Sequence, residues 1–432
     1  MSKGIREYFN NSQFAQAAYG VLNKDLESAD YITELKKKDN FSESQATQFA
    51  SQYSIVHSQQ NTKSGFSATL FKDKSEQYTL AIRGTEPIFL SPIVRDLLVA
   101  DFVDIGEKGI AVHQGIDLFN YYQQLKTPIN QKALQIEYYV GYDVPPPSQL
   151  FKLETISLEN GSGSVNVYTY IRESSSVSGL GEIPPTALIN VAGHSLGGHL
   201  ALIMARFDPK YINQTYTYNA PGFDDGRIGD KDTGWFFDSI IQVQDRINGN
   251  PTVSHSFPDD KIVNLSVPLD VISDIGNLPG GIVSLFGELE APDYLGAHGK
   301  EALSDTLAVY SLISDLSPDL RFDQITPLFE LGSNQAEGDL EGILNVLSKS
   351  LNLGAEITSG DRESFFKLIK DISKGIYEDS EASTPVLKPQ YQDLHIVNVG
   401  SLAESSHLNT ADGFAYRYAL VNLNPFAITG DD

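Results

Sequence analysis

Apolar positions in the first part of the chain follow two different spacings. Residues 65–71 and 77–83 predict two strands, and the polar residues 72–76 between them predict a turn. Apolar residues spaced three or four apart predict helices over residues 14–22 and 112–125. The spacings differ because side chains repeat every two residues on one face of a strand and about every 3.6 residues around a helix.

The same alternation continues through the middle of the chain. Residues 187–192, 214–219 and 261–267 predict strands, while residues 196–207 and 303–313 predict helices. Strands that alternate with helices build a mostly parallel sheet with helices on its faces. The expected fold class is therefore α/β.

Two stretches depart from this alternation. Residues 145–185 are rich in serine, glycine and β-branched residues, and they predict a β-rich insertion. Residues 326–432 contain two amphipathic patterns, near 340–351 and 365–376, and they predict a C-terminal extension of helical or mixed structure. We expect residues 1–325 to form the main domain, with the insertion inside it.

The composition removes several classes of protein. The 432 residues include no cysteine, 31 basic and 56 acidic side chains, and the formal net charge is −25. A disulfide framework, a cysteine-ligated zinc site and a thiol nucleophile are therefore excluded. Such an acidic surface repels phosphate backbones, which argues against nucleic-acid binding. A hydrophobic share of 41% argues against a disordered chain.

The termini and the composition bear on where the protein acts. Residues 1–11 are charged and polar, so we expect no Sec-type signal peptide there. No apolar run reaches about 18 residues, so we expect no transmembrane segment. Zero cysteine and strong acidity suit secretion in the unfolded state without an N-terminal signal, with a cytoplasmic location as the alternative. Residues 424–432 look like an interruption, so we expect the chain to be part of a longer protein.

A candidate nucleophile lies between the predicted strand 187–192 and the predicted helix that follows it. Residues 193–197 read GHSLG, which matches G-x-S-x-G with Ser195 at the centre. A serine on a sharp strand-to-helix turn projects its hydroxyl above the sheet, and glycines are needed where strand and helix approach closely. The start of a helix also favours developing negative charge. The alternative is a surface turn that matches the pattern by chance.

Five short strings occur in a fixed order along the chain: AIRGT at 81–85, DLLVAD at 96–101, VHQG at 112–115, GHSLGG at 193–198 and YNAPG at 218–222. In sequence and order they resemble the class 3 lipases of the α/β-hydrolase fold. The resemblance covers about residues 50–315, and it implies a lipid ester hydrolase. The appended region resembles, less specifically, segments beside lipase-like domains in large exported bacterial proteins.

A serine nucleophile needs a base that takes its proton and an acid that orients the base. In this fold the chain order is serine, acid, histidine, so the base must lie well after Ser195. His298 sits in a turn just before the predicted helix 303–313, where the resembled family places its base. His255 leaves little room for an acid between it and the serine, although Asp224 or Asp225 would serve.

The candidate acid is Asp270, which follows the predicted strand 261–267. The resembled family carries a similar aspartate at this place. Asp274 and Asp293 remain rivals, because the interval from Asp270 to His298 is shorter than the family usually shows.

The oxyanion of the reaction needs two N–H donors. One is expected from the backbone of Leu196, the residue after the nucleophile. The resemblance implies that Thr85 supplies the other, with its hydroxyl as a third donor.

Two apolar segments beside this chemistry, residues 88–94 and 278–286, are each either a lid over a lipid site or ordinary core.

The sequence leaves open whether the protein binds a metal ion. Carboxylates close in sequence suggest a structural calcium site, because calcium prefers oxygen ligands, but solvated carboxylates are the alternative since no EF-hand spacing is present. The acidic residues concerned are Asp224, Asp225, Asp259, Asp260, Asp315 and Asp319.

Together these patterns predict a serine ester hydrolase, a lipase that cleaves carboxylic esters of lipids such as triacylglycerol through an acyl-enzyme. The expected partners are a lipid or ester substrate and a lipid–water interface, and the chemistry requires no cofactor. A phospholipase A1 is the nearest alternative. A non-catalytic binding module of a larger exported protein is the alternative from another class.

Overall fold

The structure is a computed structural model of the whole chain, and its description covers most of the residues. The described residues are 2–84, 109–157, 163–223, 232–267, 270, 272–286, 298–317, 320, 322, 325, 340–357, 361–380, 382, 385–398, 413, 415 and 426–429.

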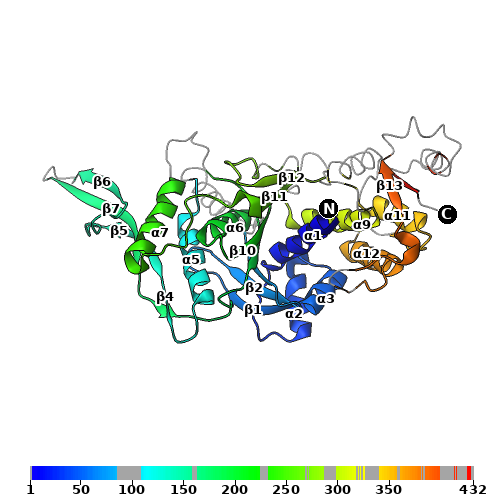
Figure 1. Cartoon of the computed structure of the whole chain (residues 1–432), viewed down its shortest axis with the longest axis horizontal. Coiled ribbons are helices and arrows are strands. Elements are labelled where there is room, and N and C mark those ends of the chain that lie inside the picture. Colours follow the sequence, from blue (N-terminus) through cyan, green and yellow to red (C-terminus); the bar gives the residue numbers. More distant parts are fainter. Residues whose placement is uncertain are drawn as a thin grey trace.

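A seven-stranded sheet forms the centre of the molecule (Figure 1). Its strand order is β1-β2-β3-β9-β10-β11-β12, with antiparallel pairing from β1 to β3 and parallel pairing from β3 to β12. The prediction of a mostly parallel α/β sheet is confirmed. The strands are β1 (Tyr53–Gln59), β2 (Ala68–Asp73), β3 (Tyr78–Ile82), β9 (Ile189–His194), β10 (Ile212–Tyr218), β11 (Ile262–Ser266) and β12 (Gly281–Ser284).

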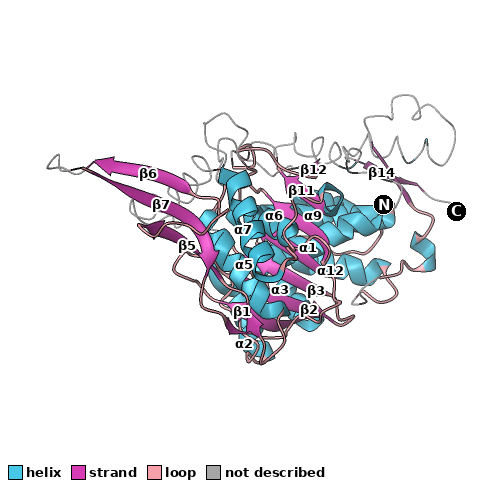
Figure 2. Ribbon diagram, turned by 60° about the vertical axis from the view of Figure 1, so that its left-hand side comes forward, coloured by secondary structure: helices cyan, strands magenta, loops and turns pink. Residues whose placement is uncertain are grey.

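Helices cover both faces of this sheet because its central strands are apolar on both sides (Figure 2). Along β3, Leu80 packs into one hydrophobic cluster and its neighbour Ala81 into the other. Such alternation follows from the two-residue repeat of a strand. The helices of one face are α1 (Ser2–Ala17) and α9 (Lys300–Leu316), and those of the other are α5 (Val112–Lys126), α6 (Leu196–Phe207) and α7 (Asp232–Asn248).

The predicted C-terminal helices are present as α11 (Leu340–Ser350) and α12 (Arg362–Ile376). They share one hydrophobic cluster with α1 and α9, so their described residues have no separate core. Arg362 of α12 also forms a bidentate ion pair with Asp305 of α9. The domain boundary near residue 325 stays a prediction. Two further helices near the N-terminus are α2 (Ser28–Lys36) and α3 (Glu43–Gln52). Two further strands near the C-terminus are β13 (His395–Asn398) and β14 (Phe426–Thr429).

A three-stranded antiparallel sheet projects from one end of the molecule, and we call it the arm (Figure 1). It consists of β5 (Ile136–Gly141), β6 (Lys152–Ser157) and β7 (Ser164–Glu173), in the order β5-β7-β6. The expected β structure is therefore present, but its sheet begins upstream of residue 145. At its base, β4 (Lys132–Ala133) pairs with β8 (Val177–Ser178).

One detail of the sequence prediction is wrong. The helix expected over residues 14–22 is α1, which ends at Ala17 and begins near the N-terminus, where polar positions hide the helical spacing. For the segment 278–286, the structure agrees with the core alternative rather than the lid, because the segment contributes β12 to the sheet edge and its Leu285 and Phe286 are buried. Residues 88–94 lie outside the described residues. Among the described residues, no helix combines the length and apolar character needed to span a bilayer.

Candidate active site

Ser195 alone forms the turn between β9 and α6, as the sequence predicts. Its backbone has φ 57° and ψ −130°, a conformation that a residue with a side chain rarely adopts. A Cβ atom at Gly193 would overlap the backbone of Gly197, and one at Gly197 would overlap the end of β3. Both glycines are therefore required for the strand and helix to meet this closely.

The structure brings together the three residues that the sequence predicts as nucleophile, base and acid. Nε2 of His298 lies 2.8 Å from Oγ of Ser195, and Nδ1 of His298 lies 2.9 Å from Oδ1 of Asp270. An ionised carboxylate only accepts hydrogen bonds, so Nδ1 carries the proton and Nε2 accepts the one from the serine hydroxyl. This tautomer is the one that a general base needs.

Asp270 is fixed by its own surroundings. It is 1% exposed, and its carboxylate accepts hydrogen bonds from the backbone N–H groups of Ile272 and Ser273, at 3.1 and 3.3 Å. Its rival Asp274 is exposed, and Asp293 lies outside the described residues. The short interval from Asp270 to His298 is sufficient because the end of β11 and the start of α9 meet at the same edge of the sheet.

Two further side chains, Tyr19 and His194, which the sequence patterns do not reveal, are linked by hydrogen bonds to the backbone of His298. The hydroxyl of Tyr19 lies 3.0 Å from Nδ1 of His194, and Nε2 of His194 lies 2.6 Å from the backbone carbonyl oxygen of His298. Burial, and to a lesser extent electrostatic interaction with His298 and Lys300, holds the pKa of His194 well below its usual value. Neutral His194 has one N–H, which the carbonyl must receive, so Tyr19 donates to Nδ1.

The oxyanion donors expected from the sequence lie at the start of α6 and the end of β3. Leu196 opens α6, so the helix itself offers no carbonyl partner for its backbone N–H. Thr85 lies outside the described residues, but the preceding Gly84 is described. A Cβ atom at Gly84 would collide with the hydroxyl of Tyr19 and the backbone of His194, so the end of β3 lies directly against the turn that carries Ser195.

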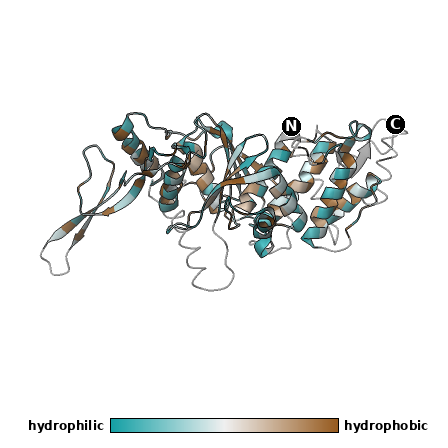
Figure 3. Cartoon of the chain, turned by 90° about the horizontal axis from the view of Figure 1, so that it is seen from below, coloured by the Kyte–Doolittle hydropathy of each residue, from teal (hydrophilic) through white to brown (hydrophobic). Residues whose placement is uncertain are grey.

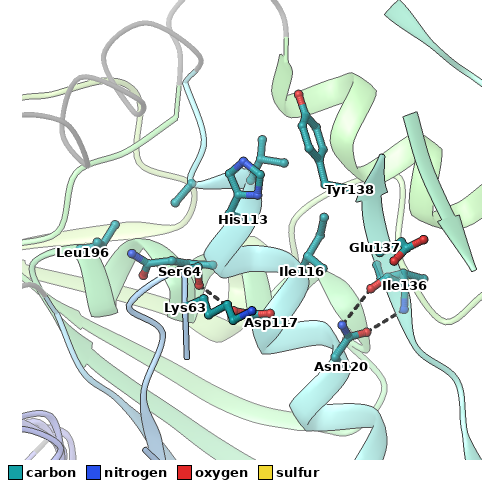
Figure 4. A pocket seen from close by; sticks show the side chains of 13 residues that line it. Lys63, Ser64, His113, Ile116, Asp117, Asn120, Ile136, Glu137, Tyr138 and Leu196 are labelled. Atoms are coloured by element: carbon teal, nitrogen blue, oxygen red, sulfur yellow. Dashed lines mark hydrogen bonds between the residues drawn. The ribbon is translucent and has the colours of Figure 1, made fainter. Parts of the chain in front are cut away.

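A cavity of about 580 Å³ opens beside Leu196 (Figure 4). Its walls come from α5, from the loop that contains Lys63 and from the first residues of β5. The side chain of Asn120, on α5, hydrogen-bonds both the backbone N–H and the carbonyl of Ile136, at 2.8 and 2.9 Å. This pair of hydrogen bonds fixes β5, and with it the base of the arm, against the helix that lines the cavity.

Within the described parts of the chain, no three histidine or acidic side chains converge in a way that suits a metal ion. Asp315 is bound by Arg6 and Tyr377, and Asp259 and Asp260 are exposed. Asp224, Asp225 and Asp319 lie outside the described residues. The calcium hypothesis stays a prediction.

Comparisons with known proteins give distant likenesses in structure. No protein-family model matches the chain, and no curated protein matches it in sequence. The Lip2 lipase of Yarrowia lipolytica is 16% identical with a TM-score of 0.31, over 68% of this chain and 82% of that one. A triacylglycerol lipase of Penicillium expansum is 12% identical with a TM-score of 0.28, over 70% and 86%. The lipase of Rhizomucor miehei, in complex with its propeptide, is 11% identical with a TM-score of 0.28, over 68% and 71%. Likenesses this weak do not assign the chain to a family.

Proposed function

We propose that the chain is a serine ester hydrolase of the α/β-hydrolase type, with Ser195, His298 and Asp270 as its catalytic residues. One observation carries the proposal. The His298 imidazole is hydrogen-bonded to the Ser195 hydroxyl at 2.8 Å on one side and to the Asp270 carboxylate at 2.9 Å on the other. A nucleophile with a base in reach, and a base oriented by a third group, is the arrangement of covalent acyl transfer.

The reaction follows from the geometry. The Ser195 oxygen attacks the ester carbonyl carbon while Nε2 of His298 takes the hydroxyl proton. The carboxylate of Asp270 stabilises the imidazolium, which then gives its proton to the leaving alcohol. Water repeats these steps on the acyl-enzyme and releases the acid. In this proposal the backbone N–H groups of Leu196 and Thr85 stabilise the oxyanion in both halves of the reaction.

Two features favour catalysis over a non-catalytic binding module. Backbone strain is found mainly at functional sites, and at Ser195 it accompanies a hydrogen bond between the hydroxyl and His298. A binding module does not require a buried carboxylate aligned on a histidine. The lipid class of the substrate rests on the strings that resemble those of class 3 lipases. A phospholipase A1 would use the same acyl-enzyme chemistry.

Replacing the nucleophile tests the proposed reaction. We expect Ser195→Ala to lower kcat for a p-nitrophenyl ester by about 10³-fold or more, because the variant lacks the hydroxyl on which the proposed acyl-enzyme forms. The control is Ser176→Ala, at an exposed serine away from the turn, which leaves kcat unchanged. Equal turnover by wild type and Ser195→Ala would refute the catalytic role of Ser195.

The two rival acids provide a matched pair of variants. We expect Asp270→Asn to lower kcat by about 10³- to 10⁴-fold, because an amide facing Nδ1 favours the wrong tautomer of His298. Asp274→Asn, four residues along the chain and exposed, changes kcat by less than about twofold. Steady-state hydrolysis of the same ester measures both, and the reverse order of effects would move the acid to Asp274.

The hydroxyl of Tyr19 is expected to position the base. In Tyr19→Phe, Nδ1 of His194 loses its donor and the tautomer that bonds the His298 carbonyl is no longer fixed, so we expect kcat to fall about tenfold with KM unchanged. Tyr31→Phe is the control, because it removes another buried tyrosine hydroxyl, one without a hydrogen-bond partner among the described residues. A change confined to thermal stability, with kcat intact, would contradict a positioning role.

A further inference from the structure

The arm exposes an unusual amount of apolar surface. Among the described residues, thirteen large hydrophobic side chains are exposed, and six of them lie between residues 140 and 156. Figure 3 shows hydrophobic residues along the arm, which stands away from the body of the molecule. The six are Val140, Tyr142, Val144, Phe151, Leu153 and Ile156.

Strand register shows how this surface arises. Residues that pair directly across an antiparallel sheet lie on the same face, so Tyr138 and Ile171 share a face with Val140 farther out on β5. Near the body this face is covered, and Ile171 is fully buried. Farther out the same face loses its cover. It carries Lys152 and Glu154 beside its apolar residues, and Val140 is 57% exposed and Ile156, on β6, is 51% exposed.

Exposed apolar surface of this extent marks a place where another phase or molecule binds. The arm is also rich in tyrosine, a side chain that combines an apolar ring with a polar tip and suits a boundary between lipid and water. Tyr142, at the end of β5, is 71% exposed. The composition of the arm therefore matches a lipid surface better than a purely aqueous environment.

The arm is continuous with the cavity that Leu196, the residue after the candidate nucleophile, helps to line. Ile136, Glu137 and Tyr138 belong to β5 and also line that cavity, which Leu196 borders on its other side (Figure 4). A lipid surface in contact with the outer part of β5 would thus lie along a wall of the cavity that Leu196 also lines. This continuity favours the substrate surface as the occupant, rather than a partner unrelated to the reaction.

Charge narrows the kind of lipid. Residues 136–173 contain five acidic and two basic side chains, within a chain of net charge −25. An anionic lipid surface would repel both the arm and the chain as a whole. We infer that the arm binds the chain to an uncharged or zwitterionic lipid surface and places the cavity lined by Leu196 against it. The inference rests on the proposed function, because that function supplies the reason for a lipid surface to meet this cavity.

Vesicle co-sedimentation tests the binding surface without using catalysis. The arm variant carries Val140→Asp and Ile156→Asp, and the control carries Val21→Asp and Val386→Asp, which are 57% and 55% exposed outside the arm. Wild type and control are expected to bind phosphatidylcholine vesicles, and the arm variant at least tenfold more weakly. Wild type is expected to bind phosphatidylglycerol vesicles more weakly than phosphatidylcholine vesicles. Equal binding by the arm variant, or no binding by wild type, overturns the inference.

Two further measurements distinguish a failure of the arm inference from a failure of the proposed function. In the arm variant, the ratio of triacylglycerol-emulsion hydrolysis to soluble-ester hydrolysis is expected to fall at least tenfold, and the control keeps the wild-type ratio. Sedimentation velocity tests a second copy of the chain as the occupant, and a wild-type dimer that only the arm variant dissociates overturns the lipid assignment. If wild type binds vesicles through the arm but hydrolyses no ester, the proposed function fails and the arm surface stands.

Discussion

The imidazole of His298 must meet a hydroxyl on one nitrogen and a carboxylate on the other, and both contacts tolerate displacements of only a few tenths of an ångström. Its two partners come from different parts of the chain. Ser195 follows β9, and Asp270 follows β11, while His298 precedes α9. Parallel strands that end at one edge of a sheet are the means by which the chain gathers these residues.

Much of the remaining structure keeps α9 in place. One side of α9 packs against α1, and its other contacts include α11 and α12 of the C-terminal part. The hydroxyl of Tyr19, just after α1, is linked through His194 to the backbone of His298. The helix that follows the proposed base, His298, is thus held by the N-terminal helix and the C-terminal helices within one core. The helices α11 and α12, which lie beyond the predicted main domain, therefore help to position α9.

The sequence predicted those parts of the site that depend on local patterns. Ser195 was identifiable because a glycine-flanked turn between an apolar run and a helical pattern rarely arises by chance. His298 was predicted from its place after the serine and before a periodic helix, together with the resemblance to class 3 lipases. The Tyr19–His194 contact spans 175 residues and has no local signature, so it could not be predicted. β5 was missed because its residues are mostly half-buried and do not alternate cleanly. The position of Thr85 stays a prediction.

Covalent labelling with a p-nitrophenyl alkylphosphonate tests the catalytic role of Ser195 most directly, because the reagent requires an activated nucleophile and leaves a stable adduct. Mass spectrometry of the digested protein should find one phosphonate per chain, on the peptide that contains Ser195, and labelling should be slower by orders of magnitude when Asp270 is replaced by asparagine. An unlabelled protein, or an adduct on another residue, would contradict the assignment of Ser195 as the nucleophile.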